Sequence, residues 1–221
     1  MLVINTDIEQ GSPEWHNARE ARVGGSTCAP LFTEPPAKAR DAGEVLGKGA
    51  VSLAYDIAAR RVKLDQPITA SPYYDLRPMS EAMEMGQLRE PFARNAYQLK
   101  TGFKVDEVGY VTDTRYEFIG FSPDGFVGSD GMIEIKCPMG KEFARVRHTL
   151  KIKHEYMCQM NFGLWLTGRD WCDHFTFHPD SPVQSLIRVE RDPAVMARLD
   201  VAIPAFNDLV IEIISSLLAG E

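Results

Sequence analysis

Two short motifs separated by a predicted turn constrain this chain more than any other feature of its sequence. Ser122-Pro123-Asp124-Gly125 is followed by Glu134-Ile135-Lys136, with Glu134 ten positions after Asp124. The segment 132–137 alternates in the pattern of a half-buried strand. Side chains two positions apart on a strand share a face, so we expect Glu134 and Lys136 to point the same way. The turn residues 128–131 should fold this strand back beside Asp124.

Such a hairpin would gather two carboxylates and one ammonium group in a small site. Carboxylates are hard oxygen ligands suited to Mg²⁺, which usually keeps several waters and binds substrate phosphate. A lysine beside them can hold or help to deprotonate an attacking water. The combination is typical of metal-assisted phosphodiester hydrolysis. Glu-x-Lys alone is common and can be an ion pair on a solvated strand, but with Pro-Asp-Gly before it the pattern resembles the PD-(D/E)xK nuclease superfamily.

The composition is that of an ordinary globular protein. The 221 residues are 44% hydrophobic and 25% charged, which suits one domain with a substantial core. We expect a single nuclease domain over residues 1–221. No apolar run reaches the roughly 20 residues of a membrane helix, and the first residues lack a signal-peptide pattern. The four cysteines have no Cys-x-x-Cys spacing and suit reduced thiols, so we expect a cytoplasmic protein with no membrane partner.

The charge is unevenly distributed. The net charge of −7 argues against a sequence-blind nucleic-acid coat, but it does not exclude a nuclease. A basic segment directly follows the metal motif, where Glu142 is the one acidic residue. A solvated helix face is the alternative, and the position beside the carboxylates favours contacts with phosphate. The candidate DNA-backbone residues are Lys141, Arg145, Arg147, Lys151 and Lys153.

The order of predicted elements is that of an α/β protein with a central mixed β-sheet flanked by helices. Capping signals, apolar periodicity and glycine stops place the boundaries. We expect a loop over 33–49 and irregular structure over 66–78. The expected helices begin at Ser12-Pro13, at Asp192-Pro193, and span 48–63, 80–100, 141–147 and 154–166. The expected strands are 104–112, 116–121, 126–127, 132–137, 171–178 and 185–191.

Two polar residues on predicted helices have open roles. Glu90 precedes Pro91, which indicates either a kink or the start of a second helix. A lone helical glutamate is normally solvated, so Glu90 alone suggests a structural residue. Gln159 lies on an otherwise apolar helix and needs a hydrogen-bond partner. It either bonds within the core or orients a ligand water.

Near the N-terminus, Ser26 is most simply a helix cap and Arg19 most simply a surface charge. Together with Ser122 they could instead form an anion pocket of hydroxyls, a guanidinium and helix amides.

Taken together, the ordered motifs resemble the phage lambda exonuclease family, the YqaJ-like viral recombination nucleases. The resemblance extends from about Gly11 to the last predicted helix, and it implies a restriction-endonuclease-like nuclease core. Where the family usually has Thr-Ala-Ser, this chain has Gly24-Gly25-Ser26, which keeps Ser26 and changes its neighbours. The motifs are Trp15-His16-x-x-Arg19, Gly25-Ser26, Gly86-x-x-x-Glu90-Pro91, Ser122-Pro123-Asp124-Gly125, Glu134-Ile135-Lys136-Cys137-Pro138 and Tyr156-x-x-Gln159.

The resemblance implies a Mg²⁺-dependent 5′-to-3′ exonuclease that acts on linear double-stranded DNA ends. It would release mononucleotides and leave 3′ single-stranded overhangs for a single-strand annealing protein, in phage-type homologous recombination. A homotrimer ring would encircle the DNA. The gene would be carried by a phage or prophage and act in the bacterial cytoplasm.

By motif position, Asp124, Glu134 and the backbone carbonyl of Ile135 would hold two Mg²⁺ ions, for which Mn²⁺ would substitute. Lys136 would position and activate the water. Glu90 and Gln159 would orient metal-bound waters. The terminal 5′-phosphate would be bound by Arg19, Ser26 and Ser122.

Three alternatives stay open at this point. The same core could belong to an endonuclease or junction resolvase, which would not depend on a free DNA end. The chain could be a non-catalytic DNA-binding recombination scaffold with a vestigial metal site. It could also be an unrelated metal-binding domain that matches by chance.

Overall fold

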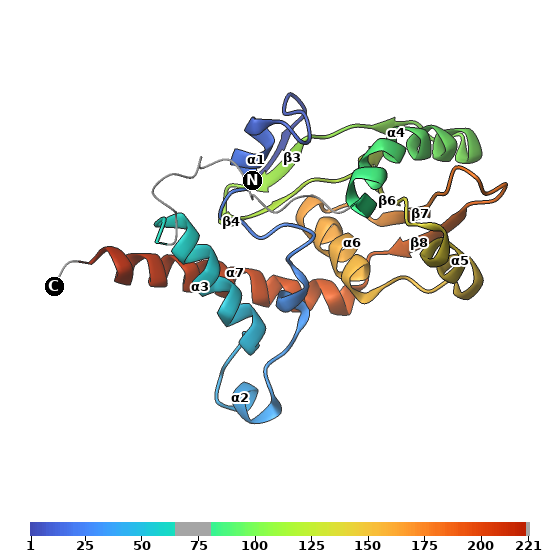
Figure 1. Ribbon diagram of the computed structural model, residues 1–221. Coiled ribbons are helices and arrows are strands. Elements are labelled where there is room, and N and C mark those ends of the chain that lie inside the picture. The colour runs from blue at the N-terminus through green and yellow to red at the C-terminus, as the bar shows by residue number, and fades with distance from the viewer. Residues whose placement is uncertain (65–80, 220–221) are drawn as a thin grey trace.

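The computed structural model describes residues 1–64 and 81–219 and contains two β-sheets (Figure 1). The first is antiparallel, with strand order β1-β3-β4, and the second has order β2-β5-β6-β7-β8. In the second sheet β6 and β7 are parallel, while the other neighbours are antiparallel. The strands are β1 (Leu2–Asn5), β2 (Val105–Asp106), β3 (Tyr110–Asp113), β4 (Tyr116–Phe121), β5 (Gly125–Val127), β6 (Gly131–Lys136), β7 (Trp171–Thr176) and β8 (Ser185–Glu190).

The helices flank these sheets, which confirms the α/β class with a mixed sheet. Two of the predicted helix starts have the expected caps, because Ser12 accepts from the Trp15 amide and Asp192 accepts from the Ala194 amide. The helices are α1 (Pro13–Arg19), the 3₁₀ helix η1 (Ala29–Phe32), α2 (Ala37–Asp41), α3 (Lys48–Arg61), α4 (Glu81–Thr101), α5 (Gly140–Thr149), α6 (His154–Thr167) and α7 (Pro193–Leu218).

The predicted strand 104–112 was wrong, because two strands of different sheets occupy this region. β2 pairs with β5, whereas β3 pairs with β1 and β4. The chain changes sheets at Gly109, whose amide donates to the Asn5 carbonyl and where a Cβ atom would lie 1.9 Å from the Ile8 carbonyl oxygen. Strand β1 was not predicted from the sequence, so no partner was expected that would draw β3 away from β2.

Four further predictions need correction or fall outside the described residues. The predicted loop 33–49 contains α2, which Figure 1 shows at the tip of a projecting arm. Helix α4 continues through Pro91, so no second helix begins after Glu90. The expected irregular segment 66–78 and the helix start at residue 80 lie outside the described residues.

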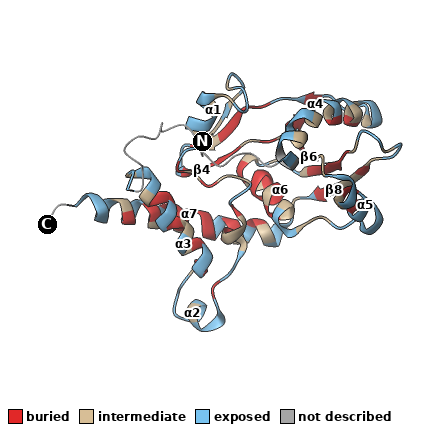
Figure 2. Ribbon diagram, viewed as in Figure 1, coloured by how far each residue is buried: buried red, intermediate tan, exposed pale blue. Residues whose placement is uncertain are grey.

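Two apolar cores lie on opposite faces of the five-stranded sheet. The larger core joins the sheets to α3, α6 and α7, and the smaller core lies under α4 (Figure 2). Along β6, Met132 belongs to the larger core, whereas Ile133 and Ile135 belong to the smaller one. Because strand side chains alternate, Glu134 and Lys136 lie on the Met132 side, which α6 covers.

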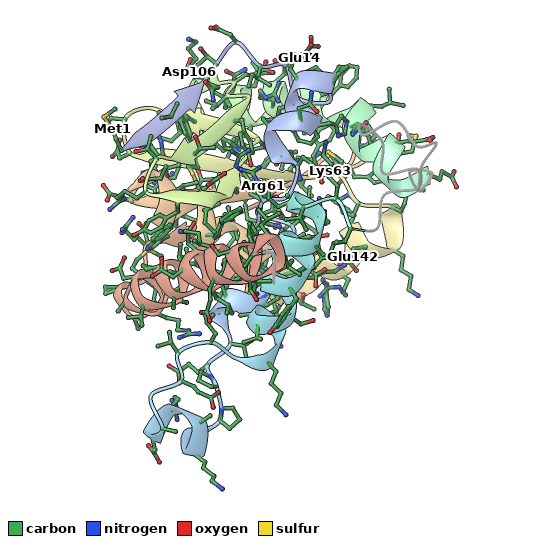
Figure 3. The ribbon with its side chains drawn as sticks, turned by 90° about the vertical axis from the view of Figure 1, so that its left-hand side faces the viewer. Met1, Glu14, Arg61, Lys63, Asp106 and Glu142 are labelled. Atoms are coloured by element: carbon green, nitrogen blue, oxygen red, sulfur yellow. The ribbon has the colours of Figure 1, made fainter. Side chains whose placement is uncertain are left out.

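Helix α7 is long and apolar enough, by length and composition, to cross a membrane. Its buried residues, including Leu199, Phe206 and Val210, instead belong to the larger core. A core helix passes the same test of length and hydropathy, and these buried residues make α7 part of the fold. The end of α3 is fastened to β4 by an ion pair between Arg61 and Glu117, with Arg61 labelled in Figure 3.

Candidate active site

The hairpin of β5 and β6 brings Asp124 and Glu134 together. In the antiparallel pairing Gly125 lies opposite Ile133, and the Ile135 amide donates to Asp124 Oδ2 at 2.6 Å. A Cβ atom at Gly125 would lie 2.2 Å from Val105 Cγ1, so a glycine lets β2 approach directly beside Asp124. The backbone of β6 therefore fixes the Asp124 carboxylate at the start of the Glu134–Lys136 segment.

Glu134 and Lys136 form an ion pair on the face of β6 that α6 covers. The Glu134 side chain is almost fully buried, and the Lys136 ammonium pairs with its Oε1 atom. Burial raises the pKa of Glu134 to about 8, against the opposing effect of Lys136. Burial alone would lower the pKa of Lys136, but the Glu134 and Asp124 carboxylates raise it above its ordinary value. The lysine is therefore an ammonium group at neutral pH.

Glu90 reaches the same site from α4. Burial and the nearby Asp124 carboxylate raise its pKa to about 7. Arg94, one turn further along α4, donates to Glu90 Oε1 at 2.8 Å and pairs with Glu107 Oε2 at 2.9 Å. Arg94 therefore holds Glu90 in place. Its guanidinium also balances part of the negative charge of the carboxylates.

The donor set suits a divalent cation. Burial also raises the pKa of Asp124. Asp124, Glu90 and Glu134 are thus three carboxyl groups with raised pKa values in one site. The positive charges near them are those of Lys136 and Arg94. Across residues 1–64 and 81–219, no three His, Cys, Asp or Glu side chains form a ready-made metal centre. Two carboxylates and the Ile135 carbonyl fit Mg²⁺, which takes oxygen ligands, keeps several waters and needs few protein groups.

The expected anion pocket is partly assembled around Trp15. The Trp15 indole N–H donates to Ser122 Oγ at 2.8 Å, and the Arg19 guanidinium lies 3.9 Å from the centre of a Trp15 ring. Burial lowers the pKa of Arg19, which is only half-exposed and so is not a simple surface charge. One tryptophan thus orients both the hydroxyl and the guanidinium.

Ser26 is exposed in a turn that follows Gly24, where a Cβ atom would lie 4.0 Å from Arg19 Nη2. Cys28, not Ser26, is the N-cap of η1. The turn packs closely on α6, because a Cβ atom at Gly25 would lie 2.8 Å from Gln159 Cγ. Gln159 is therefore placed beside the Gly25–Ser26 turn. The roles of Ser26 and Gln159 stay predictions.

The basic segment lies on α5 and the following loop. Its side chains are exposed, except Lys153, which is half-buried. Glu142 binds Arg145 at 2.7 Å and Lys153 at 3.2 Å, and these bonds lower the pKa of Glu142 to about 2. Figure 3 labels Glu142 on α5. Two of the candidate DNA-backbone residues, Arg145 and Lys153, are thus already paired with the Glu142 carboxylate.

Comparison with known proteins identifies the family. Residues 14–170 match the model of the YqaJ-like viral recombinase domain, which is more than half of the chain. The chain belongs to the YqaJ-like viral recombinase family. This result removes the chance match to an unrelated metal-binding domain. The chain matches no curated protein sequence.

Solved structures agree with this family. The chain is similar to an alkaline exonuclease from Laribacter hongkongensis, at 29% identity and a TM-score of 0.72, covering 93% of this chain and 96% of that one. A second structure of that exonuclease, in complex with dAMP, matches at 30% identity with the same coverage and TM-score. A phage-related exonuclease from Haemophilus somnus 129PT shares the fold, at 17% identity, a TM-score of 0.63 and coverage of 91% and 99%.

Several residues that surround this candidate site were not predicted from the sequence to lie there. Arg94 lies four positions after Glu90, a spacing that predicts a helical ion pair and was readable. Tyr156 was noted as part of a motif but was given no role. His174 lies directly across from Glu134 in the parallel pairing of β6 and β7. That proximity depends on a strand register which no local pattern specifies.

Proposed function

We propose that this chain is a metal-dependent 5′-to-3′ exonuclease that acts on the ends of linear double-stranded DNA. It releases mononucleotides and leaves 3′ single-stranded overhangs. The observation that carries the proposal is the buried group of Asp124, Glu134 and Lys136 on one hairpin, in a member of the YqaJ-like family. The Laribacter exonuclease, which shares the fold over nearly the whole chain, supports an end-directed activity.

Asp124, Glu134 and the Ile135 carbonyl are the groups that would hold Mg²⁺, or Mn²⁺ in its place. When bound, the cation supplies a Lewis acid and a water of lowered pKa. The carboxylates hold protons more tightly than usual in the metal-free chain, so each must lose its proton before it can bind a cation. Occupancy of the site should therefore increase with pH.

Lys136 is placed to hold the attacking water by donating a hydrogen bond. Its raised pKa makes it an ammonium donor and a poor proton acceptor in the metal-free chain. Glu90, fixed by Arg94, can accept a hydrogen bond from a water at the same site. Gln159 has the same proposed role from α6. These groups orient water, which is the part of the chemistry that the chain itself supplies.

The selection of a DNA end rests on a second group of residues. Arg19, Ser122 and Ser26 would bind the terminal 5′-phosphate, with Trp15 orienting the first two. A terminal phosphate carries more negative charge than an internal diester, so a guanidinium can distinguish them. The remaining exposed cations, Lys141, Arg147 and Lys151, would contact the DNA backbone.

The wider biological setting belongs to the same proposal. The chain would act as a single nuclease domain in a homotrimer ring, beside a single-strand annealing protein, in the cytoplasm of a bacterium that carries the phage or prophage. The YqaJ-like family supports a role in viral recombination.

The test uses linear duplexes labelled separately at each 5′ and 3′ end, together with uniformly labelled circular duplexes, incubated with Mg²⁺ or with chelator. We expect mononucleotides from 5′ ends of linear DNA, with Mg²⁺ alone. Cutting of circular DNA would instead assign an endonuclease or junction resolvase. Binding of DNA without Mg²⁺-dependent release from any substrate would assign a non-catalytic scaffold.

A further inference from the structure

An aromatic pair, Tyr156 and His174, lies beside the proposed catalytic lysine. His174 on β7 is the cross-strand neighbour of Glu134 on β6, and its side chain is almost fully buried. The His174 ring stacks on the Tyr156 ring of α6, with centroids 6.0 Å apart and an interplanar angle of 27°. His174 Nδ1 lies 3.4 Å from Thr176 Oγ1, and its Nε2 has no partner among the described residues.

Tyr156 in turn contacts the catalytic lysine. The Lys136 ammonium lies 4.9 Å from the centre of the Tyr156 ring, and the Lys153 ammonium lies 5.6 Å from it. A cation within about 6 Å of an aromatic ring is attracted by the negative face of the ring. The Tyr156 ring therefore lies where the site meets the basic segment.

Lys136 needs a contact of this kind. Its long side chain is flexible, and in the metal-free chain an ion pair with Glu134 orients its ammonium. A metal ion held by Glu134 would share that carboxylate with Lys136 and weaken the ion pair. An aromatic ring attracts the ammonium and does not compete for the metal ion.

We propose that Tyr156 is a positioning residue whose ring, braced by the buried ring of His174, holds the Lys136 ammonium at the active site. The catalytic part of this inference rests on the proposed function, because it assumes hydrolysis that depends on Lys136. The structural part does not, since it concerns where the lysine side chain lies. The ring, and not the phenol hydroxyl, carries the effect.

The first test compares Tyr156→Phe, which keeps the ring, with Tyr156→Leu, which removes it. Tyr156→Leu should lower kcat for nucleotide release roughly 10- to 100-fold, because small misplacements of a catalytic group are costly. Its KM for DNA ends should stay within about three-fold of the parent. Tyr156→Phe should keep both constants close to those of the parent.

Tyr116→Leu is the matched control. Tyr116 is also half-buried, and its ring packs at a tilt of 43° against Trp165, with centroids 5.7 Å apart. The Arg115 guanidinium lies 5.2 Å from the centre of the Tyr116 ring, but Tyr116 belongs to the other sheet. This variant should lose a similar amount of stability and keep the kcat of the parent.

The second test reads the lysine directly by NMR, with lysine labelled at its ε-CH₂ group. The Lys136 signal, assigned by its loss in Lys136→Arg, should show an upfield ring-current shift in the parent and in Tyr156→Phe. The shift should disappear in Tyr156→Leu. It should decrease in His174→Ala and be kept in His174→Phe, which retains a stacking ring.

The outcomes separate the two proposals. If the parent releases no nucleotides with Mg²⁺, the proposed function fails, and the ring-current shifts still decide whether Tyr156 holds Lys136. If the parent is active and Tyr156→Leu keeps both the shift and the rate, the positioning proposal is overturned. Equal losses in Tyr156→Leu and Tyr156→Phe would overturn it too, because the hydroxyl would then carry the effect.

Discussion

At the scale of single residues, the main feature of the site is a group of buried carboxylates. The nearby Lys136 and Arg94 balance their negative charge only in part. Glu134 holds its proton up to a pKa of about 8 in the folded chain, against an ordinary value of 4.5. The folded state therefore binds more protons than the unfolded state between these values, and its stability decreases as pH rises through them. A cation at the site would remove this cost, so the same residues link pH, metal binding and stability.

We predict that Glu134→Gln raises the melting temperature of the metal-free protein at about pH 8–9 and changes it little near pH 5. The substitution removes the cost of a buried negative charge, so thermal melts across this range should show a shallower loss of stability. Glu142→Gln is the control, since Glu142 has a lowered pKa and should not contribute a slope in this range. A variant as pH-sensitive as the parent would exclude Glu134 as the source.

A second prediction at this scale concerns Arg19. The parent should degrade 5′-phosphorylated ends faster than 5′-hydroxyl ends, and Arg19→Ala should reduce that preference about 10- to 100-fold, as expected for the loss of a hydrogen bond to a charged group. Competing the two end types in one reaction measures the preference. Arg22→Ala is a nearby control, because its guanidinium bonds backbone carbonyls of Ala18 and Glu117. An equal loss on both ends in Arg19→Ala would make Arg19 a general backbone contact or a folding residue.

At the scale of elements, a buried polar network fastens α4 to the five-stranded sheet. Asp173 on β7 accepts from Arg188 of β8 at 2.8 and 2.9 Å and from the Tyr97 hydroxyl of α4 at 2.8 Å. The Asp173 side chain is almost fully buried. Because α4 also carries Glu90, this network holds the helix that completes the proposed active site.

We predict that Arg188→Ala lowers the free energy of unfolding by about 1–3 kcal/mol, because it leaves part of the buried Asp173 carboxylate unpaired. Arg145→Ala removes an exposed partner of Glu142 and should change it by less than about 1 kcal/mol. Denaturant unfolding of both variants gives the comparison. A smaller loss in Arg188→Ala than in Arg145→Ala would show that the network does not stabilise the sheet.

The elements also show what the sequence could predict. The strand 132–137 and its turn were predicted from the alternation of apolar and polar residues and from the glycine spacing. As expected, Asp124 lies beside this strand, where its carboxylate accepts from the Ile135 amide of β6. The split between β2 and β3 was unreadable, because it depends on pairing with β1, which lies about a hundred positions away. For the same reason, the meeting of His174 with Glu134 followed from no local pattern, since a parallel register is set by long-range packing.

At the scale of the whole molecule, the protein and its proposed substrate, DNA, both carry a net negative charge. Glu142 already pairs with Arg145 and Lys153. One copy of the chain therefore leaves few exposed basic side chains beside the site to contact DNA. A closed ring would bring several copies of Lys141, Arg147 and Lys151 to one channel, and cyclic symmetry permits such a head-to-tail assembly. Such a ring would reconcile a net charge of −7 with DNA processing.

We predict a homotrimer that stays on one DNA molecule through many cleavages. Light scattering should give about three times the 24.7 kDa mass of the chain. A trap of excess unlabelled DNA, added after the reaction starts, should not stop release from DNA already bound. A monomer that leaves after each cleavage would contradict the ring and leave the nuclease proposal intact.

The most direct test of the account measures Mg²⁺ binding and nucleotide release together in Asp124→Asn, Glu134→Gln and Lys136→Met. Calorimetry should show that the first two variants lose Mg²⁺ binding while Lys136→Met keeps it, and all three should release nucleotides at least about 100-fold more slowly than the parent. DNA retention should survive in each variant. Release near the parent rate by Asp124→Asn or Glu134→Gln would contradict the central claim that this hairpin is the catalytic metal site.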